Sequence, residues 1–233
     1  MSSPAKTGAA LDPGEGWRNL CLPRFAERAT SGPLRVAIEG PNGAGKTTLS
    51  WALSRSLGVP WCLGTDEAWF AESLKVRMIR DAEWHASAMF FLSGCFEQTR
   101  LLRQRSDRMV IMDRCLWSSL AVHAAENPDR LKTLIAMLQP IAHFIQIPDL
   151  TLVLKASFAT CQSRIANKSG TARALDQLTA TADFHAREQA FYRWLAGQTP
   201  TVVFVDTDLA TADQVAEKSL ALLKVRIPEP VER

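Results

Sequence analysis

The chain has 233 residues, enough for one α/β domain with a full hydrophobic core, and 47% of them are apolar, as in globular proteins. Its net charge of +3 suits an anionic small-molecule substrate but is too small to favour nucleic acid as a partner. No apolar run approaches the roughly 18 residues of a transmembrane helix, so we expect no membrane span, and the N-terminus has no apolar segment of the kind found in a secretory signal. The five dispersed cysteines indicate reduced cytoplasmic thiols rather than disulfides or a zinc site.

The first 33 residues are rich in Ser, Pro, Gly and charge and show little periodicity. We therefore predict an N-terminal extension over residues 1–33, with disorder from Met1 to Gly16 and a short helix from Trp17 to Ala29 that packs on the domain. The domain itself is predicted to span residues 34–233.

Residues 40–48 (GPNGAGKTT) match the pattern G-x-x-x-x-G-K-[ST] of a phosphate-binding loop. The preceding run, Leu34–Glu39, is apolar and β-branched, which is typical of a buried strand. After the loop, apolar residues recur at helical spacing as far as Leu57, and Gly58 favours a helix end there. Strand, glycine loop and helix follow in the order that this motif requires.

The residue types of this loop suit a bound nucleoside triphosphate. Glycines lack a Cβ, so the backbone can curl and direct successive N–H groups at one anion, while the helix N-terminus adds partial positive charge. Lys46 can reach the β- and γ-phosphates, and the Thr47 hydroxyl can bind Mg²⁺. We predict that the triphosphate is bound by Gly40, Asn42, Gly43, Ala44, Gly45, Lys46, Thr47 and Thr48.

A short second strand is predicted over Val59–Leu63, and Asp66, Glu67 and Trp69 follow it. In open α/β sheets, ligands bind beyond the carboxyl ends of the strands, which places both carboxylates near a substrate. An equally simple interpretation is that Thr65 or Asp66 caps the next helix, and the two roles are compatible.

The third predicted strand, Met109–Asp113, consists of four apolar residues that end in a carboxylate. This is typical of the strand that supports Mg²⁺ in phosphate-loop proteins. We expect Asp113 to hold the water shell of the metal while Thr47 binds the metal directly. Arg114 follows at the same edge and can bind two oxygens of a phosphate, although a surface Asp–Arg pair is the simpler alternative.

The rest of the chain continues the alternation of strands and helices. Met89, Leu92 and Phe96 lie at helical spacing in a long predicted helix and are expected in the core. Helices are predicted over residues 74–105, 116–125, 131–138, 158–166, 184–195 and 212–223, and strands over residues 150–154 and 201–206. Five strands that alternate with helices predict a three-layer α/β/α fold with a five-stranded parallel sheet.

Four motifs resemble those of the thymidylate kinase-like family of P-loop nucleoside and nucleotide kinases. The loop has the form EGPNGAGKTT from Glu39, and Asp113–Ala121 (DRCLWSSLA) is close to the family pattern D-R-Y-x-x-S-S-x-A. Residues 148–151 (PDLT) and Asp183–Arg187, with Tyr192 beyond, also follow family patterns. The resemblance implies a P-loop NTPase fold with a lid over about residues 167–182.

The resemblance also implies roles and cofactors. ATP and Mg²⁺ would be the cofactors, Lys46 would hold ATP, and Arg114 would hold the phosphate of the acceptor. The lid would close over the transferring phosphoryl group, and any arginine finger would come from there, since the loop carries no arginine. The lid cations of this sequence are Arg164, Lys168 and Arg173, each of which could instead be an ordinary solvated charge.

Departures from the family pattern concern the positions that read the acceptor. Asn42 replaces an Asp that contacts the acceptor sugar, and no arginine stands near residues 92–95, where the family reads thymine. Cys115 replaces a Tyr, and His123 replaces a Gln. We therefore expect that the chain is not the housekeeping thymidylate kinase. Candidate acceptor contacts are Asp66, Trp69, Arg114 and His123, although His123 can equally be a helix-packing imidazole.

Two kinase activities remain open. A nucleoside monophosphate acceptor is favoured, because Asp113 and Arg114 with Ser118 follow the nucleotide-kinase form and an anionic oxygen needs no base. A hydroxyl acceptor would need a carboxylate base, and Asp66 or Glu67 with Trp69 close behind resembles the arrangement in deoxynucleoside kinases.

A transporter ATPase is excluded, since the signature L-S-G-G-Q is missing. We expect a cytoplasmic enzyme whose partner is a small-molecule nucleotide or nucleoside. We leave a homodimer open.

Overall fold

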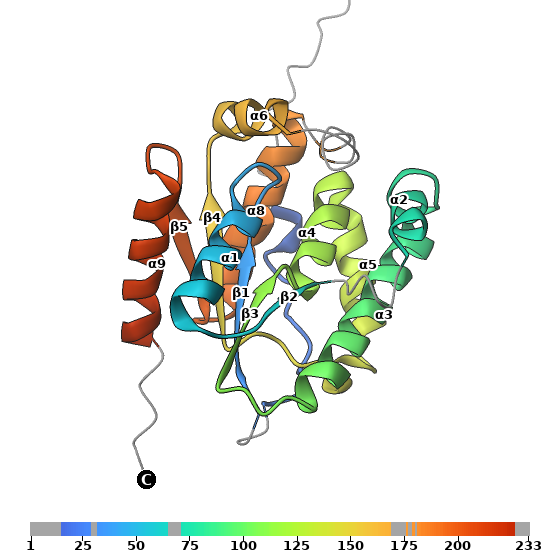
Figure 1. The fold of residues 1–233 in the computed structure, drawn as a ribbon. Helices are drawn as coiled ribbons and strands as arrows, with labels where there is room; N and C mark the ends of the chain where they lie inside the picture. Colours follow the sequence, from blue (N-terminus) through green and yellow to red (C-terminus); the bar gives the residue numbers. More distant parts are fainter. Residues whose placement is uncertain are drawn as a thin grey trace, which may run out of the picture.

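The computed structural model describes residues 15–28, 32–64, 71–168, 176, 179 and 181–226. Within them, five strands form one sheet in the order β2-β3-β1-β4-β5, with every pair parallel (Figure 1). The strands are β1 (Leu34–Glu39), β2 (Trp61–Leu63), β3 (Met109–Asp113), β4 (Leu150–Lys155) and β5 (Val202–Asp206). The predicted α/β fold with a five-stranded parallel sheet is confirmed.

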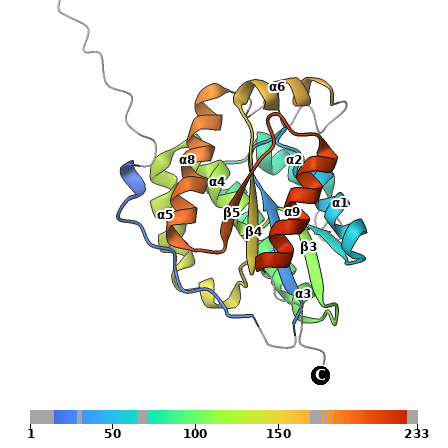
Figure 2. The ribbon, with the colours of Figure 1, turned by 90° about the vertical axis from the view of Figure 1, so that its left-hand side faces the viewer.

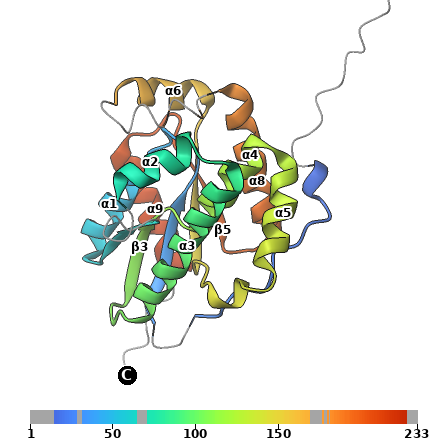
Figure 3. The same cartoon turned by 90° about the vertical axis from the view of Figure 1, so that its right-hand side faces the viewer.

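Helices cover both faces of this sheet (Figures 2 and 3). Helices α1 and α9 pack on one face, whereas α3, α4 and α8 lie on the other, with α5 beside α4. Helix α6 lies at the carboxyl edge, where β4 ends (Figure 1). The bounds are α1 (Lys46–Leu57), α2 (Glu72–Arg80), α3 (Trp84–Arg103), α4 (Leu116–Glu126), α5 (Pro128–Leu138), α6 (Phe158–Ala166), α8 (Ala182–Gln198) and α9 (Ala212–Arg226), with short 3-10 helices η1 (Glu15–Trp17) and η2 (Ala142–Phe144).

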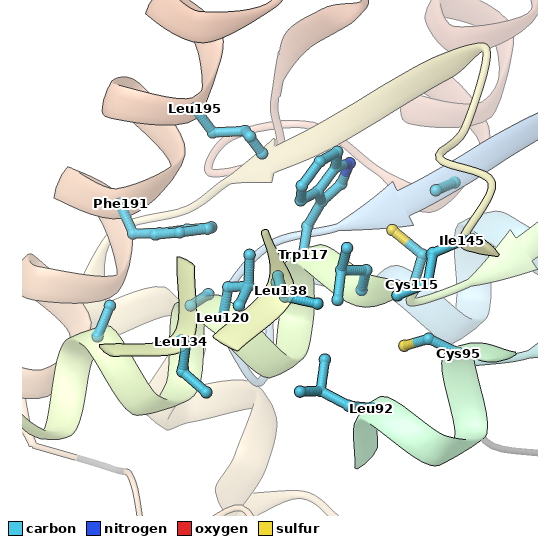
Figure 4. Packing of buried hydrophobic residues seen from close by; sticks show 14 of the residues in the cluster. Leu92, Cys95, Cys115, Trp117, Leu120, Leu134, Leu138, Ile145, Phe191 and Leu195 are labelled. Atoms are coloured by element: carbon cyan, nitrogen blue, oxygen red, sulfur yellow. The ribbon is translucent and has the colours of Figure 1, made fainter. Parts of the chain in front are cut away.

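The strands are apolar on both sides because each side faces a helical layer. In β3, Val110 and Met112 face the cluster formed with α3, α4 and α8, whereas Ile111 between them faces the cluster formed with α1 and α9. Figure 4 shows part of the first cluster, to which α4 contributes Leu120, α8 Phe191, α5 Leu134 and α3 Leu92. The two cores hold the sheet rigidly and fix the position of its carboxyl edge.

The predicted helix over Trp17–Ala29 is wrong in its described part, because only η1 is helical there. The chain instead runs extended across the outer side of the helical layer (Figure 2). The buried indole of Trp17 donates to the carbonyl of Pro128 at 3.0 Å, and Phe25 packs edge-on against Trp117 at 5.7 Å. These two contacts hold the segment against α5 and α4.

The long helix predicted over residues 74–105 is two helices, α2 and α3, with a break at residues 81–83. The buried stripe of α3 includes Ala88, Leu92, Cys95 and Leu102. The predicted core position of Leu92 is therefore confirmed, whereas Met89 is exposed, because it lies one residue beyond the stripe on the outer side of the helix.

None of the five cysteines, all of which lie in the described part of the chain, forms a disulfide. Burial raises the pKa of the Cys95 thiol to about 12 and that of Cys161 to about 11, so these thiols stay protonated at neutral pH. Among the described residues, no helix is both long and apolar enough to cross a membrane.

Candidate active site

The glycine loop between β1 and α1 is held against β4 and α6. Gly40 has φ 127° and Gly43 has φ 83°, a region that side chains rarely adopt. A Cβ on Gly40 would lie 2.5 Å from the carbonyl oxygen of Leu154, and one on Gly43 would lie 2.5 Å from that of Cys161. Only glycine fits this close approach, and α1 then begins at Lys46, so its N-terminal N–H groups face the loop.

Lys46 is the buried cation of the loop, with 5% of its surface exposed. Its Nζ donates to the carbonyl oxygens of Gly40 at 2.7 Å and Pro41 at 2.8 Å. Burial, followed by the repulsion of Arg114, lowers the pKa of Lys46 to about 8. The ammonium is therefore held at the loop, and the nearby carboxylates do not fully offset the cost of burying its charge. This favours the binding of an anionic ligand.

Asp113 and Thr47 lie side by side at the end of β3 and the start of α1. The Thr47 hydroxyl donates to Oδ2 of Asp113 at 2.6 Å. The other carboxylate oxygen, Oδ1, is buried and has no hydrogen-bond partner in the part of the chain that the structure describes. A carboxylate with a free oxygen beside a hydroxyl is a set of ligands that fits Mg²⁺ or its water shell.

Arg114 follows Asp113 in a left-handed backbone conformation with φ 72°. For a residue other than glycine this costs about 1–3 kcal/mol, so its surroundings must hold it there. Its Nη2 donates to Oδ1 of Asn42 at 2.6 Å, and its Nη1 donates to Oγ of Ser118 at 3.3 Å. Burial opposes the charge, but Asp113 and Glu39 outweigh it and hold the pKa of Arg114 above its ordinary value.

Glu39 is a central residue of the site to which the sequence analysis assigned no role. It ends β1 and is completely buried, and its carboxylate accepts from the backbone N–H groups of Cys115 at 2.7 Å and Ser118 at 3.2 Å. The hydroxyls of Ser118 and Tyr192 also donate to it, at 2.5 and 2.9 Å. The only sign of its importance in the sequence was that a charged residue ends an apolar strand directly before the loop.

Glu188 of α8 is a second buried carboxylate that the sequence analysis missed, with 5% of its surface exposed. Desolvation raises its pKa, although Lys46 and Arg114 oppose the shift. Within the described residues no group donates a hydrogen bond to Glu188, and it lines a small cavity with Asn42 and Thr179. It lies three residues beyond His185 on a helix with little hydrophobic periodicity, so no pattern marked it.

The described part of the predicted lid contacts the loop. Asn42 Nδ2 donates to the Thr179 hydroxyl at 3.2 Å, and Lys168 forms an ion pair with Asp176 at 2.6 Å. Arg164 of α6 donates to the carbonyl oxygens of Ala44 at 3.2 Å and Thr207 at 2.7 Å. Asn42 thus joins Arg114 on one side to Thr179 on the other.

Some of the remaining predicted site residues are described by the structure and others are not. Four lie outside the described residues, namely Asp66, Glu67, Trp69 and Arg173. His123 is buried on α4 and packs edge-on against Trp84 at 6.2 Å. Thr48 is exposed in the first turn of α1, beside Thr47.

The sequence profile of the deoxynucleoside kinase family matches residues 36–225. The chain belongs to this family. It is therefore a nucleoside or nucleotide kinase, which transfers a phosphoryl group with ATP as the donor. The predicted enzyme class and the resemblance to P-loop nucleoside and nucleotide kinases are confirmed. The family match begins in β1, so the extended segment at residues 15–28 lies outside it.

Solved structures of related kinases share the fold of this kinase. A thymidylate kinase from Candida albicans has a TM-score of 0.70 and 21% identity, with 84% of this chain and 93% of that chain covered. A deoxyadenosine kinase from M. mycoides has a TM-score of 0.64 and 16% identity, with 82% of this chain and 100% of that chain covered. No curated protein sequence matches the chain.

Proposed function

We propose that this kinase transfers the γ-phosphate of ATP to a nucleoside monophosphate, with Arg114 as the ligand of the acceptor phosphate. The supporting observation is the position of the Arg114 guanidinium. It lies at the carboxyl edge beside Asp113, its charge is favoured by three carboxylates, and Asn42 and Ser118 orient it. A guanidinium held in this way can bind two phosphate oxygens.

The donor side follows from the loop. The backbone N–H groups and Lys46 would bind the triphosphate, and Asp113 with Thr47 would hold Mg²⁺. The metal supplies neutralising charge for the phosphate oxygens. Arg173 would approach from the lid to stabilise the transferring group. A monophosphate acceptor is already anionic, so positioning and charge neutralisation are sufficient without a base.

A hydroxyl acceptor is the second candidate, because the matching family is named for kinases of deoxynucleosides. A hydroxyl benefits from a carboxylate base, and Asp66 or Glu67 would serve. Glu188 is a further carboxylate with a raised pKa near Lys46 and Arg114. A screen of ATP consumption over matched pairs, each nucleoside with its own monophosphate, separates the two candidates. Turnover of unphosphorylated substrates alone would overturn the proposal, and thymidine monophosphate is expected to be a poor acceptor.

Arg114→Ala is expected to lower kcat/KM for a monophosphate acceptor by roughly 10²–10³-fold, because it removes a charge-assisted fork to the phosphate. KM for the acceptor should rise and kcat should fall, as measured by steady-state kinetics at saturating ATP. Arg193→Ala, which removes an exposed arginine of α8, is the matched control and should change neither. Unchanged monophosphate kinetics in folded Arg114→Ala would assign the acceptor phosphate to another residue.

ATP binding is expected to take up a proton above about pH 8. Lys46 of the free enzyme has a pKa of about 8, so it is charged below this pH and increasingly neutral above it. A bound triphosphate favours the ammonium, so the apparent affinity should fall by up to about tenfold per pH unit above pH 8. Calorimetry at pH 9 in two buffers of different ionisation enthalpy measures the uptake. Lys46→Arg, which stays charged, should abolish it, and zero uptake by the unmodified enzyme would contradict the assignment.

A further inference from the structure

We propose that Glu39 is a positioning residue that fixes Arg114 in its functional orientation. The inference rests on the proposed participation of Arg114 in phosphoryl transfer, and it does not depend on whether the acceptor is a phosphate or a hydroxyl. It is carried by the contacts of the Glu39 carboxylate, which reach the residues on the C-terminal side of Arg114 and no solvent.

The backbone of Arg114 needs support from both sides, because its φ of 72° is strained for a residue with a Cβ. On the N-terminal side, its own N–H donates to the carbonyl oxygen of Ile38 at 3.1 Å. On the C-terminal side, the next N–H, that of Cys115, donates to Glu39 at 2.7 Å. The last two residues of β1 therefore hold the strained peptide from both ends.

Glu39 also caps α4. Cys115 is the N-cap residue of this helix, and its side chain makes no capping hydrogen bond. Oε1 of Glu39 takes that place, since it accepts from the N–H groups of Cys115 and Ser118. A carboxylate at a helix N-terminus is favoured both by these donors and by the helix dipole. The start of α4, and with it the turn at Arg114, is thereby tied to β1.

The Ser118 hydroxyl extends this control to the guanidinium. A hydroxyl carries one hydrogen, and that of Ser118 is donated to Oε2 of Glu39 at 2.5 Å. Its lone pairs are then left to accept from Nη1 of Arg114 at 3.3 Å. Glu39 thus determines that Ser118 presents an acceptor to Arg114 rather than a donor.

Tyr192 anchors the same carboxylate from α8, with its hydroxyl 2.9 Å from Oε2. Because Glu39 is completely buried, it acts through Arg114 and does not contact the acceptor itself.

The test is a double-mutant cycle between Glu39→Gln and Arg114→Ala. Glutamine keeps one oxygen that can accept from the N–H groups of Cys115 and Ser118, so the fold should survive. Its amide nitrogen is a donor, however, so the Ser118 hydroxyl would accept a hydrogen bond from residue 39 instead of donating one. We expect Glu39→Gln to lower kcat/KM for the acceptor by roughly tenfold and to change KM for ATP by less than about threefold. Glu217→Gln, at an exposed carboxylate of α9, is the matched control and should change both by less than about threefold. In the Arg114→Ala background, the effect of Glu39→Gln on the acceptor should disappear.

The inference is overturned by additive effects in the cycle, and also by equal effects of Glu39→Gln on kcat/KM for the acceptor and on KM for ATP. If Glu39→Gln does not fold, Ser118→Ala replaces it in the cycle, and non-additivity with Arg114→Ala is again expected. The cycle is measured with whichever acceptor the screen identifies. A screen that finds only unphosphorylated acceptors therefore removes the proposed function while the cycle still decides the role of Glu39. An Arg114→Ala variant with unchanged kcat/KM overturns both.

Discussion

Lys46→Ala is expected to abolish phosphoryl transfer and to leave the fold intact. The ammonium is the buried cation at the start of α1, and its two contacts are the carbonyl oxygens of Gly40 and Pro41. Removing a preorganised charge that stabilises the transition state typically costs 10²–10³-fold in kcat, and we expect at least this loss, roughly 3–4 kcal/mol. The fold should survive, because burial already disfavours the charged form of Lys46.

The measurement is kcat at saturating ATP, together with a thermal unfolding curve of the same preparation. Lys132→Ala, which removes an exposed lysine of α5, is the matched control and should retain full activity. Lys46→Arg keeps the charge in a larger, planar group and should recover only part of the activity. A folded Lys46→Ala enzyme with near-normal turnover would show that the loop is not the site of transfer.

The elements next to the loop could be predicted well because their signals are local. The β1 strand has the predicted bounds, and the helix after the loop ends at Gly58 in a left-handed conformation, as a C-terminal glycine suggests. β3 and α6 also have the predicted bounds. In each case an apolar run is bounded by a glycine, a polar turn or a capping residue that is close in sequence.

Features that depend on distant partners could not be predicted from the sequence. The segment after Trp17 is extended because Trp17 and Phe25 pack against helices that follow about one hundred residues later, near Pro128 and Trp117. The Glu39 carboxylate is held by the hydroxyls of Ser118 and Tyr192, which α4 and α8 bring to the end of β1. No local pattern contains these pairings, and the fold must be known before they can be seen.

Asp113 is placed to act on the metal rather than on the nucleotide. Its Oδ2 accepts from Thr47, and its buried Oδ1 has no hydrogen-bond partner among the described residues. An unpaired buried carboxylate oxygen is costly unless a ligand or its water completes it. The loop N–H groups and Lys46 would supply most of the affinity for the triphosphate, so a change at Asp113 should separate metal dependence from nucleotide binding.

Asp113→Asn is therefore expected to raise the Mg²⁺ concentration for half-maximal activity by about 10–100-fold, the range typical for the loss of a group that supports a metal site. The affinity for ATP measured without metal should change by less than about threefold, because the amide still accepts from Thr47 and the loop is untouched. Thr47→Val should shift the Mg²⁺ titration in the same direction. Asp129→Asn, at an exposed carboxylate of α5, should not shift it. A titration by Asp113→Asn that superposes on that of the unmodified enzyme would remove Asp113 from the metal site.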